Sequence, residues 1–158
     1  MLQNILNYDY LWIRLRVKGG AYGCMSGFGR DGDCYMVSYL DPKLAETNEV
    51  YDKLPEYLEQ FDQDERSMDR YVIGAISEMD IPKNPAALGV RGLTAYLSGI
   101  TREQLQKERD EVIDTDAKEI RALVPYAKAV LSNNCLCVVG NENKIKENSS
   151  LFTTVRSL

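Results

Sequence analysis

The chain has 158 residues, 44% hydrophobic and 27% charged, which is typical of one globular domain with a single core. Its 19 basic and 24 acidic side chains give a net charge of −5, which excludes the basic surface that nucleic acid or an anionic membrane would require. The chain has no histidine, which excludes a Ser-His-Asp triad, a Cys-His pair and a histidine-based zinc site within it.

The first predicted elements are a helix and a β-hairpin. Apolar and aromatic residues recur at helical spacing over residues 5–17, and the pair Gly19-Gly20 ends this helix. The runs 21–28 and 34–40 are rich in aromatic and β-branched residues, and glycine and aspartate separate them, which predicts two antiparallel strands. The glycines of this turn match the dinucleotide-binding pattern G-x-G-x-x-G. That pattern requires a following helix, and because a strand follows here we interpret the glycines as a hairpin turn.

Five helices are predicted for the middle of the chain. Asp41 and Pro42 start the first at about Lys43, and Pro55 should kink or split it. The starts of the other four are predicted at Asp64, Pro85, the capping box Thr101–Gln104 and Asp116. The helix after Thr101 is heavily charged, so we expect it at the surface.

Two further strands are predicted near the C-terminal end. The run CLCVVG at 135–140 is typical of a buried strand, residues 141–148 form a short helix or loop, and residues 151–155 form a last strand. The chain is therefore predicted to be α+β, with strands at both ends. A sheet of four strands is thin for five helices, which predicts missing strands. An unpaired sheet edge would result, and it predicts a dimer through that edge.

The four cysteines predict reduced thiols rather than disulfides or a metal site. A disulfide-rich secreted domain has more cysteine in a shorter chain, and a zinc ribbon needs two C-x-x-C pairs. The four thiols, including those of the C-x-C pair Cys135 and Cys137, are expected to behave as small apolar residues of the core. No apolar signal-peptide core is found, and no apolar run approaches the about 20 residues of a membrane span. We therefore expect a cytoplasmic protein that binds neither membrane nor nucleic acid.

The segment LRVKGGAYG at residues 15–23 contains the candidate functional residues. Arg16 is a fixed cation with a forked set of donors, and the Tyr22 hydroxyl can donate to a developing oxyanion. Because only a glycine turn separates them, both side chains could point at one place. The alternative is an arginine whose stem covers apolar surface and a tyrosine buried in the core.

This segment also begins a resemblance to a known family. The motif R-x-K-G-G-A-Y-G is followed by a strand ending S-Y-x-D-P, then by AISEMD, LSGITREQLQKERDEVIDT and CVVGNENKI. In this order and spacing, the chain from about Tyr10 onward resembles the C-terminal part of the presequence-protease-like zinc metallopeptidases of the insulinase/pitrilysin group. It departs from that pattern at Leu40, where arginine is frequent, and at Pro55, within a helix that is usually continuous.

The resemblance implies a fold and a set of site residues. Such enzymes have four related α/β-roll domains of the mitochondrial-processing-peptidase-like type, with helices packed on one face of a mostly antiparallel sheet. Residues 1–158 would be a single domain, the C-terminal portion of the last of the four. Zinc would be held in the N-terminal half of the parent, with no metal ligand in this chain. By motif position, Arg16 and Tyr22 would hold the substrate and steady the tetrahedral intermediate, and Gly19 and Gly20 would bind substrate.

The implied function is that of a non-catalytic C-terminal fragment of a zinc metalloendopeptidase that degrades peptides. The fragment would contribute chamber wall and an Arg/Tyr substrate clamp, with the N-terminal half of the peptidase and an unfolded peptide as partners. It is expected to be inactive alone. The alternative is a stand-alone or heteromeric subunit of the same fold that binds peptides or supports an assembly. An independent enzyme using Cys24 or Cys34 is a weaker alternative, because no base accompanies either thiol.

Overall fold

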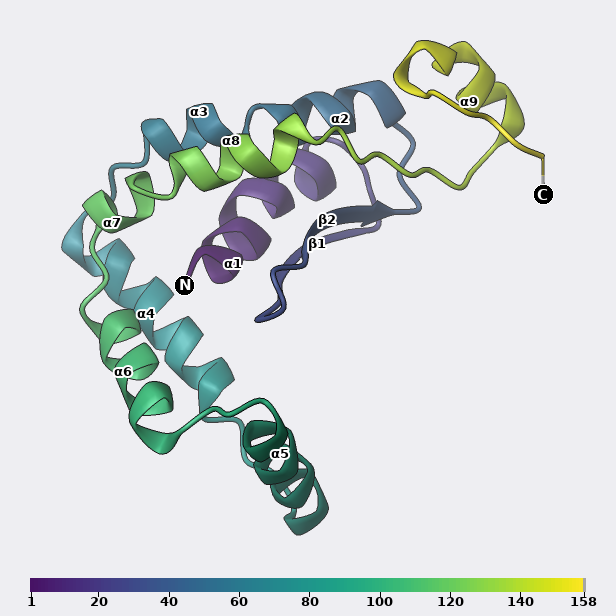
Figure 1. Ribbon diagram of the computed structural model, residues 1–158. Coiled ribbons are helices and arrows are strands. Elements are labelled where there is room, and N and C mark those ends of the chain that lie inside the picture. The colour runs from purple at the N-terminus through teal and green to yellow at the C-terminus, as the bar shows by residue number, and fades with distance from the viewer. Residues whose placement is uncertain (158) are drawn as a thin grey trace. The chain divides into compact units, whose positions relative to one another are not determined.

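The computed structural model describes residues 1–157, which form helices and one two-stranded antiparallel sheet (Figure 1). This mixture agrees with the α+β prediction. The chain divides into two compact units, each described by itself. The larger unit comprises residues 2–61 and the stretch from Ile120 onward, and the smaller comprises Asp62–Glu119 with Met1.

The larger unit begins with the predicted helix, which starts at Leu2 rather than at residue 5. Its three successive segments are α1 (Leu2–Ile5), η1 (Leu6–Tyr10) and η2 (Trp12–Val17). Its second and third segments are wound as π-helix, in which each N–H bonds five residues back. The apolar face that it buries consists of Ile5, Leu6, Tyr10, Leu11 and Leu15.

The predicted hairpin is confirmed as β1 (Gly23–Phe28) and β2 (Cys34–Tyr39), paired from Gly23↔Tyr39 to Phe28↔Cys34. The glycine motif forms its turn, as predicted, because β2 follows where a nucleotide site would need a helix. On the outer edge of β1, the Asn7 side chain replaces a neighbouring strand: its Oδ1 accepts from Ser26 N at 2.6 Å, and its Nδ2 donates to Ser26 O at 3.3 Å.

Prolines divide the next helices of the larger unit. The helix predicted from Lys43 is split into α2 (Leu44–Asp52) and α3 (Leu54–Glu59), because Pro55 lacks the N–H that a continuous helix requires. The helix predicted from Asp116 is likewise two helices, α7 (Ala117–Arg121), within which the division between the two units falls, and α8 (Val124–Ser132). Helices α3 and α8 pack together, with an ion pair of 2.6 Å between Lys128 Nζ and Glu59 Oε1.

The smaller unit contains the three helices α4 (Glu65–Met79), α5 (Pro85–Leu97) and α6 (Arg102–Ile113). The predicted caps are confirmed: the Asp64 carboxylate accepts from Ser67 N at 2.8 Å, and the Thr101–Gln104 capping box is complete. Helices α4 and α6 pack together, whereas α5 buries none of its residues.

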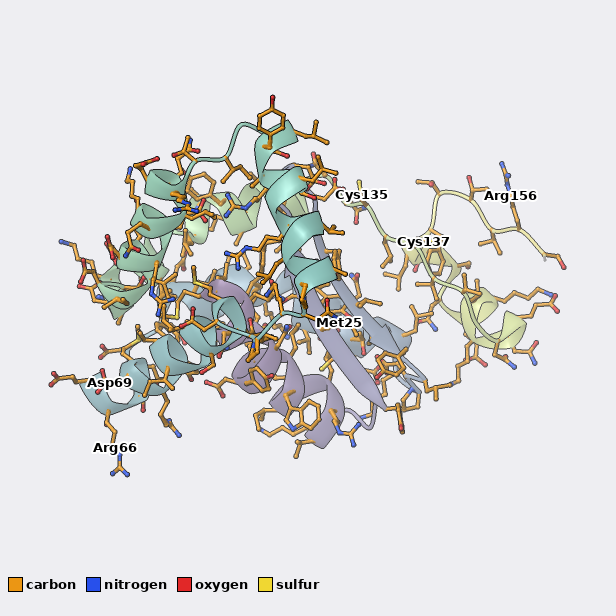
Figure 2. The ribbon with its side chains drawn as sticks, turned by 90° about the horizontal axis from the view of Figure 1, so that it is seen from below. Met25, Arg66, Asp69, Cys135, Cys137 and Arg156 are labelled. Atoms are coloured by element: carbon orange, nitrogen blue, oxygen red, sulfur yellow. The ribbon has the colours of Figure 1, made fainter. Side chains whose placement is uncertain are left out.

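The two strands predicted near the C-terminal end are wrong. Residues 135–140 and 152–155 have no regular structure, and between them lie α9 (Glu142–Glu147) and η3 (Ser149–Leu151). A strand forms only where another strand bonds to its backbone, and no strand in residues 1–157 pairs with either run. Cys135 and Cys137 are therefore exposed, contrary to the expectation that they are buried (Figure 2). Cys34 is exposed as well, Cys24 is buried, and all four are free thiols.

Candidate functional site

The structure brings Arg16 and Tyr22 together at the end of the first helix. The guanidinium carbon of Arg16 lies 5.5 Å from the ring centroid of Tyr22 and 4.6 Å from that of Trp12. The Tyr22 ring in turn meets the Tyr39 ring edge-on, with centroids 5.7 Å apart. We refer to Trp12, Arg16, Tyr22 and Tyr39 as the Arg16 cluster. Trp12 and Tyr39 were not predicted as site residues.

The glycine pair turns the chain so that Tyr22 returns to Arg16. Gly20 has a φ of +88°, a left-handed conformation that glycine adopts without strain. The turn is closed by two backbone hydrogen bonds, from Gly20 N to Arg16 O at 3.1 Å and from Ala21 N to Leu15 O at 2.9 Å. At Gly19, a Cβ would lie 2.4 Å from Leu15 O, so only glycine fits. Both glycines thus have a backbone role, and their predicted contact with substrate stays a prediction.

The backbone of Tyr22 is held by a strained residue at the end of β2. Tyr22 N donates to Leu40 O at 3.3 Å, and Leu40 has a φ of +47°, which is uncommon for a non-glycine residue. The Leu40 side chain is 77% exposed, so packing of that side chain does not explain the strain. Strained residues of this kind cluster at functional sites.

The polar groups of Arg16 and Tyr22 are available to a ligand. Tyr22 is 61% exposed, so the alternative interpretation as a core tyrosine is wrong. Within residues 1–157, neither the Arg16 guanidinium nor the Tyr22 hydroxyl makes a hydrogen bond or an ion pair. Adjacent guanidinium and phenol donors can bind a carbonyl or carboxylate oxygen together.

The Cys24 thiol, on which the charge of Arg16 acts, is poorly suited to act as a nucleophile. Burial raises the pKa of the Cys24 thiol, and the charge of Arg16 opposes that rise only in part. A raised pKa keeps the thiol protonated at neutral pH, whereas the thiolate is the reactive form. This argues against the alternative of an enzyme that uses Cys24.

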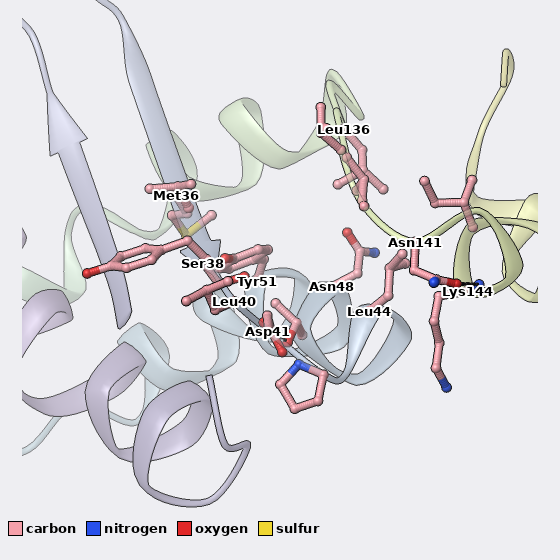
Figure 3. A pocket seen from close by; sticks show the side chains of 18 residues that line it. Met36, Ser38, Leu40, Asp41, Leu44, Asn48, Tyr51, Leu136, Asn141 and Lys144 are labelled. Atoms are coloured by element: carbon pink, nitrogen blue, oxygen red, sulfur yellow. Dashed lines mark hydrogen bonds between the residues drawn. The ribbon is translucent and has the colours of Figure 1, made fainter. Parts of the chain in front are cut away.

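A separate pocket of about 530 Å³ lies beside β2, with α2 and residues 136–145 as further walls (Figure 3). Neither Arg16 nor Tyr22 lines it. The hydroxyl of Tyr51, one of its lining residues, is buried without a hydrogen-bond partner in the described chain. Burial raises the pKa of Tyr51 to about 12, and the nearby Ser38 hydroxyl opposes this rise in part. The Tyr51 and Ser38 hydroxyls do not have the geometry of a hydrogen bond. The sequence did not predict this pocket, because residues 135–140 were expected to form a buried strand.

Tyr10 and Tyr51 make a matched pair for a stability test. Burial also raises the pKa of Tyr10 to about 12, but its hydroxyl donates to Val50 O at 2.6 Å. Tyr10→Phe is expected to lower the free energy of unfolding by about 1 kcal/mol, whereas Tyr51→Phe, which removes an unpartnered hydroxyl, should leave it unchanged or raise it. Urea unfolding at neutral pH measures both. An equal loss in the two variants would contradict the expectation.

The same two tyrosines give a pH dependence. Because an unfolded tyrosine ionises near pH 10, each folded pKa is raised, and the folded chain keeps both phenols neutral after the unfolded chain has begun to ionise. Their contribution to stability is therefore fully present below about pH 10 and is lost as the pH rises toward about 12. In the double phenylalanine variant, this alkaline decline should be shallower.

The side chains of residues 1–157 do not offer a zinc site. In residues 1–157, no three His, Cys, Asp or Glu side chains lie close enough together to hold a metal ion, and the sequence has no histidine. In the same residues, no helix combines the length and the apolar character that crossing a membrane requires.

Comparison with known proteins places these features in context. The family model of the PreP C-terminal domain matches residues 1–140. Protein HypA of Clostridium perfringens is 47% identical over 158 residues, which are 100% of this chain and 16% of that protein. Presequence protease 1, chloroplastic/mitochondrial, of Arabidopsis thaliana is 30% identical over 97% of this chain and 15% of its own length. The mitochondrial presequence protease of Schizosaccharomyces pombe is 28% identical over 84% of this chain and 13% of its own length. The chain thus spans about one sixth or less of these relatives.

Proposed function

Since the chain belongs to the PreP C-terminal domain family, we propose that it is the non-catalytic C-terminal part of a zinc-dependent peptidase that degrades peptides. The observation that carries this proposal is the coverage of the relatives. The match to Protein HypA covers 100% of this chain but only 16% of that protein. The match to the Arabidopsis presequence protease covers 97% of this chain but only 15% of that protein. A chain that matches the PreP C-terminal domain, and that covers only a small share of a presequence protease, is best explained as the corresponding part of such an enzyme.

The remaining parts of the proposed enzyme lie outside this chain. In this proposal the zinc and its ligands belong to the N-terminal half of the parent, and no metal-binding group of side chains is found in residues 1–157. In this proposal the chain is the C-terminal portion of the last of four α/β-roll domains, and it forms part of the wall around an unfolded peptide. The N-terminal half of the peptidase is its partner. Dimer formation through an exposed sheet edge stays a prediction.

Arg16 and Tyr22 form the proposed substrate clamp. The Arg16 guanidinium, on a half-buried residue, lies over the ring of the exposed Tyr22, and both polar groups are unpaired within residues 1–157, which suits them to bind oxygen atoms of a peptide. Arg16 would hold the peptide, and the Tyr22 hydroxyl would donate to the oxyanion that develops during cleavage. Gly19 and Gly20 support this clamp through the turn that joins the two residues.

The mass of the native polypeptide that contains this sequence tests the proposal. A chain several times larger than 17.9 kDa, with about one zinc on the same purified band, is the expected result. A native chain of 17.9 kDa without zinc would overturn it and would favour the stand-alone or heteromeric subunit.

A further inference from the structure

We propose that Trp12 and Tyr39 are positioning residues, which fix the Arg16 guanidinium and the Tyr22 ring in one arrangement before a peptide binds. The functional consequence rests on the proposed clamp. The positioning itself rests on the geometry of the Arg16 cluster and can be tested without any activity.

The Arg16 guanidinium lies over two aromatic rings. Its central carbon is 4.6 Å from the Trp12 centroid and 5.5 Å from the Tyr22 centroid, both within the range of a cation–π interaction. A flat guanidinium that stacks on rings keeps the N–H groups of its edge free. Stacking therefore restrains the long side chain while leaving the donors of Arg16 available for a ligand.

Trp12 is the only tryptophan of the chain and lies one helical turn before Arg16. It remains 40% exposed, although the neighbouring Leu11 and Leu15 on the same helix are buried. A large ring kept at the surface contributes little to the core, and the Arg16 guanidinium lies over this one. Its position is thus better explained by Arg16 than by packing.

Tyr39 restrains Tyr22 from the opposite strand, and Gly23 makes this possible. Gly23 is the register partner of Tyr39. The Tyr39 ring occupies the space above Gly23, where a Cβ would lie 2.4 Å from its Cζ. A glycine at this position lets the Tyr39 ring meet the Tyr22 ring edge-on, with centroids 5.7 Å apart. Such aromatic pairs favour a defined orientation.

NMR of the 158-residue chain tests the positioning directly, because ring currents shift the side-chain resonances of a stacked arginine. In Trp12→Leu, the Arg16 side-chain resonances should move toward the values of a free arginine, and in Trp12→Phe they should keep most of their shift. Tyr39→Leu should move the Tyr22 ring resonances. Arg14, which stacks on the buried Tyr10 ring at 4.7 Å on the same helix, is the internal control and should not respond to Trp12→Leu. Unchanged Arg16 resonances in Trp12→Leu would overturn the proposal.

The second test uses the complete peptidase and an unstructured peptide substrate. Trp12→Leu should lower kcat/KM about two- to five-fold, the fold-change that an exposed cation–π contact corresponds to. In the Arg16→Gln background the same change should have no further effect, because Trp12 would act through Arg16. An equal loss in both backgrounds would overturn the positioning role. Wild-type activity in Arg16→Gln itself would instead overturn the clamp, while the NMR result would still decide the positioning.

Discussion

Tyr22→Phe in the complete peptidase is expected to lower kcat about 100- to 1,000-fold while changing KM much less, because removal of one oxyanion donor has an effect of that size. The exposed phenol makes no hydrogen bond within residues 1–157, so the substitution removes a donor without breaking an internal contact. The ring that meets Arg16 and Tyr39 is retained. Steady-state kinetics on an unfolded peptide separate the two parameters.

Tyr126→Phe is the matched control for this variant. Tyr126 lies on α8, is 71% exposed and belongs to neither the Arg16 cluster nor the pocket, so its kcat should equal that of the wild type. An unchanged kcat in Tyr22→Phe would contradict the proposed role of the hydroxyl. A rise in KM with an unchanged kcat would assign Tyr22 to substrate binding alone.

Leu15→Ala is expected to lower the free energy of unfolding by about 2–5 kcal/mol, the range found when a buried leucine is truncated in a packed core. Leu15 is 2% exposed and anchors the end of the first helix beside Arg16. Urea unfolding of the 158-residue chain would show the loss as a lower midpoint with an unchanged slope.

Val17→Ala, on the other side of Arg16, is the control. Val17 is 62% exposed, and its truncation should change the free energy of unfolding by less than about 0.5 kcal/mol. Equal losses in the two variants would show that the helix end is not held by the burial of Leu15.

Local signals in the sequence were sufficient to predict most of the helices and the hairpin. Pro55 divides its helix because the missing N–H is a property of the residue itself, and the caps at Asp64 and Thr101 depend only on groups within one turn. The strand prediction for residues 135–140 was wrong because a strand depends on a partner from another part of the chain, not on local groups alone. A strand requires hydrogen bonds from a partner, and a short apolar run does not show whether the partner is present.

The candidate site was predictable only in part. Arg16 and Tyr22 come from the motif, and Trp12 could have been found from its spacing of four residues on a helix. Tyr39 could not, because its place opposite Gly23 depends on the register of the hairpin. The left-handed backbone of Leu40 has no signal in the sequence, since leucine rarely adopts it.

The π-winding of the first helix has a consequence for how the sequence can vary. Each bond that spans five residues encloses one residue more than an α-helical bond does, as in the bond from Lys18 N to Ile13 O at 3.0 Å. A helix wound in this way can lose one exposed residue, such as Tyr8, and return to α-helical winding. Relatives with a one-residue deletion in this helix could thus keep the glycine turn and the Arg16 cluster in place, and an alignment gap there would not displace the site.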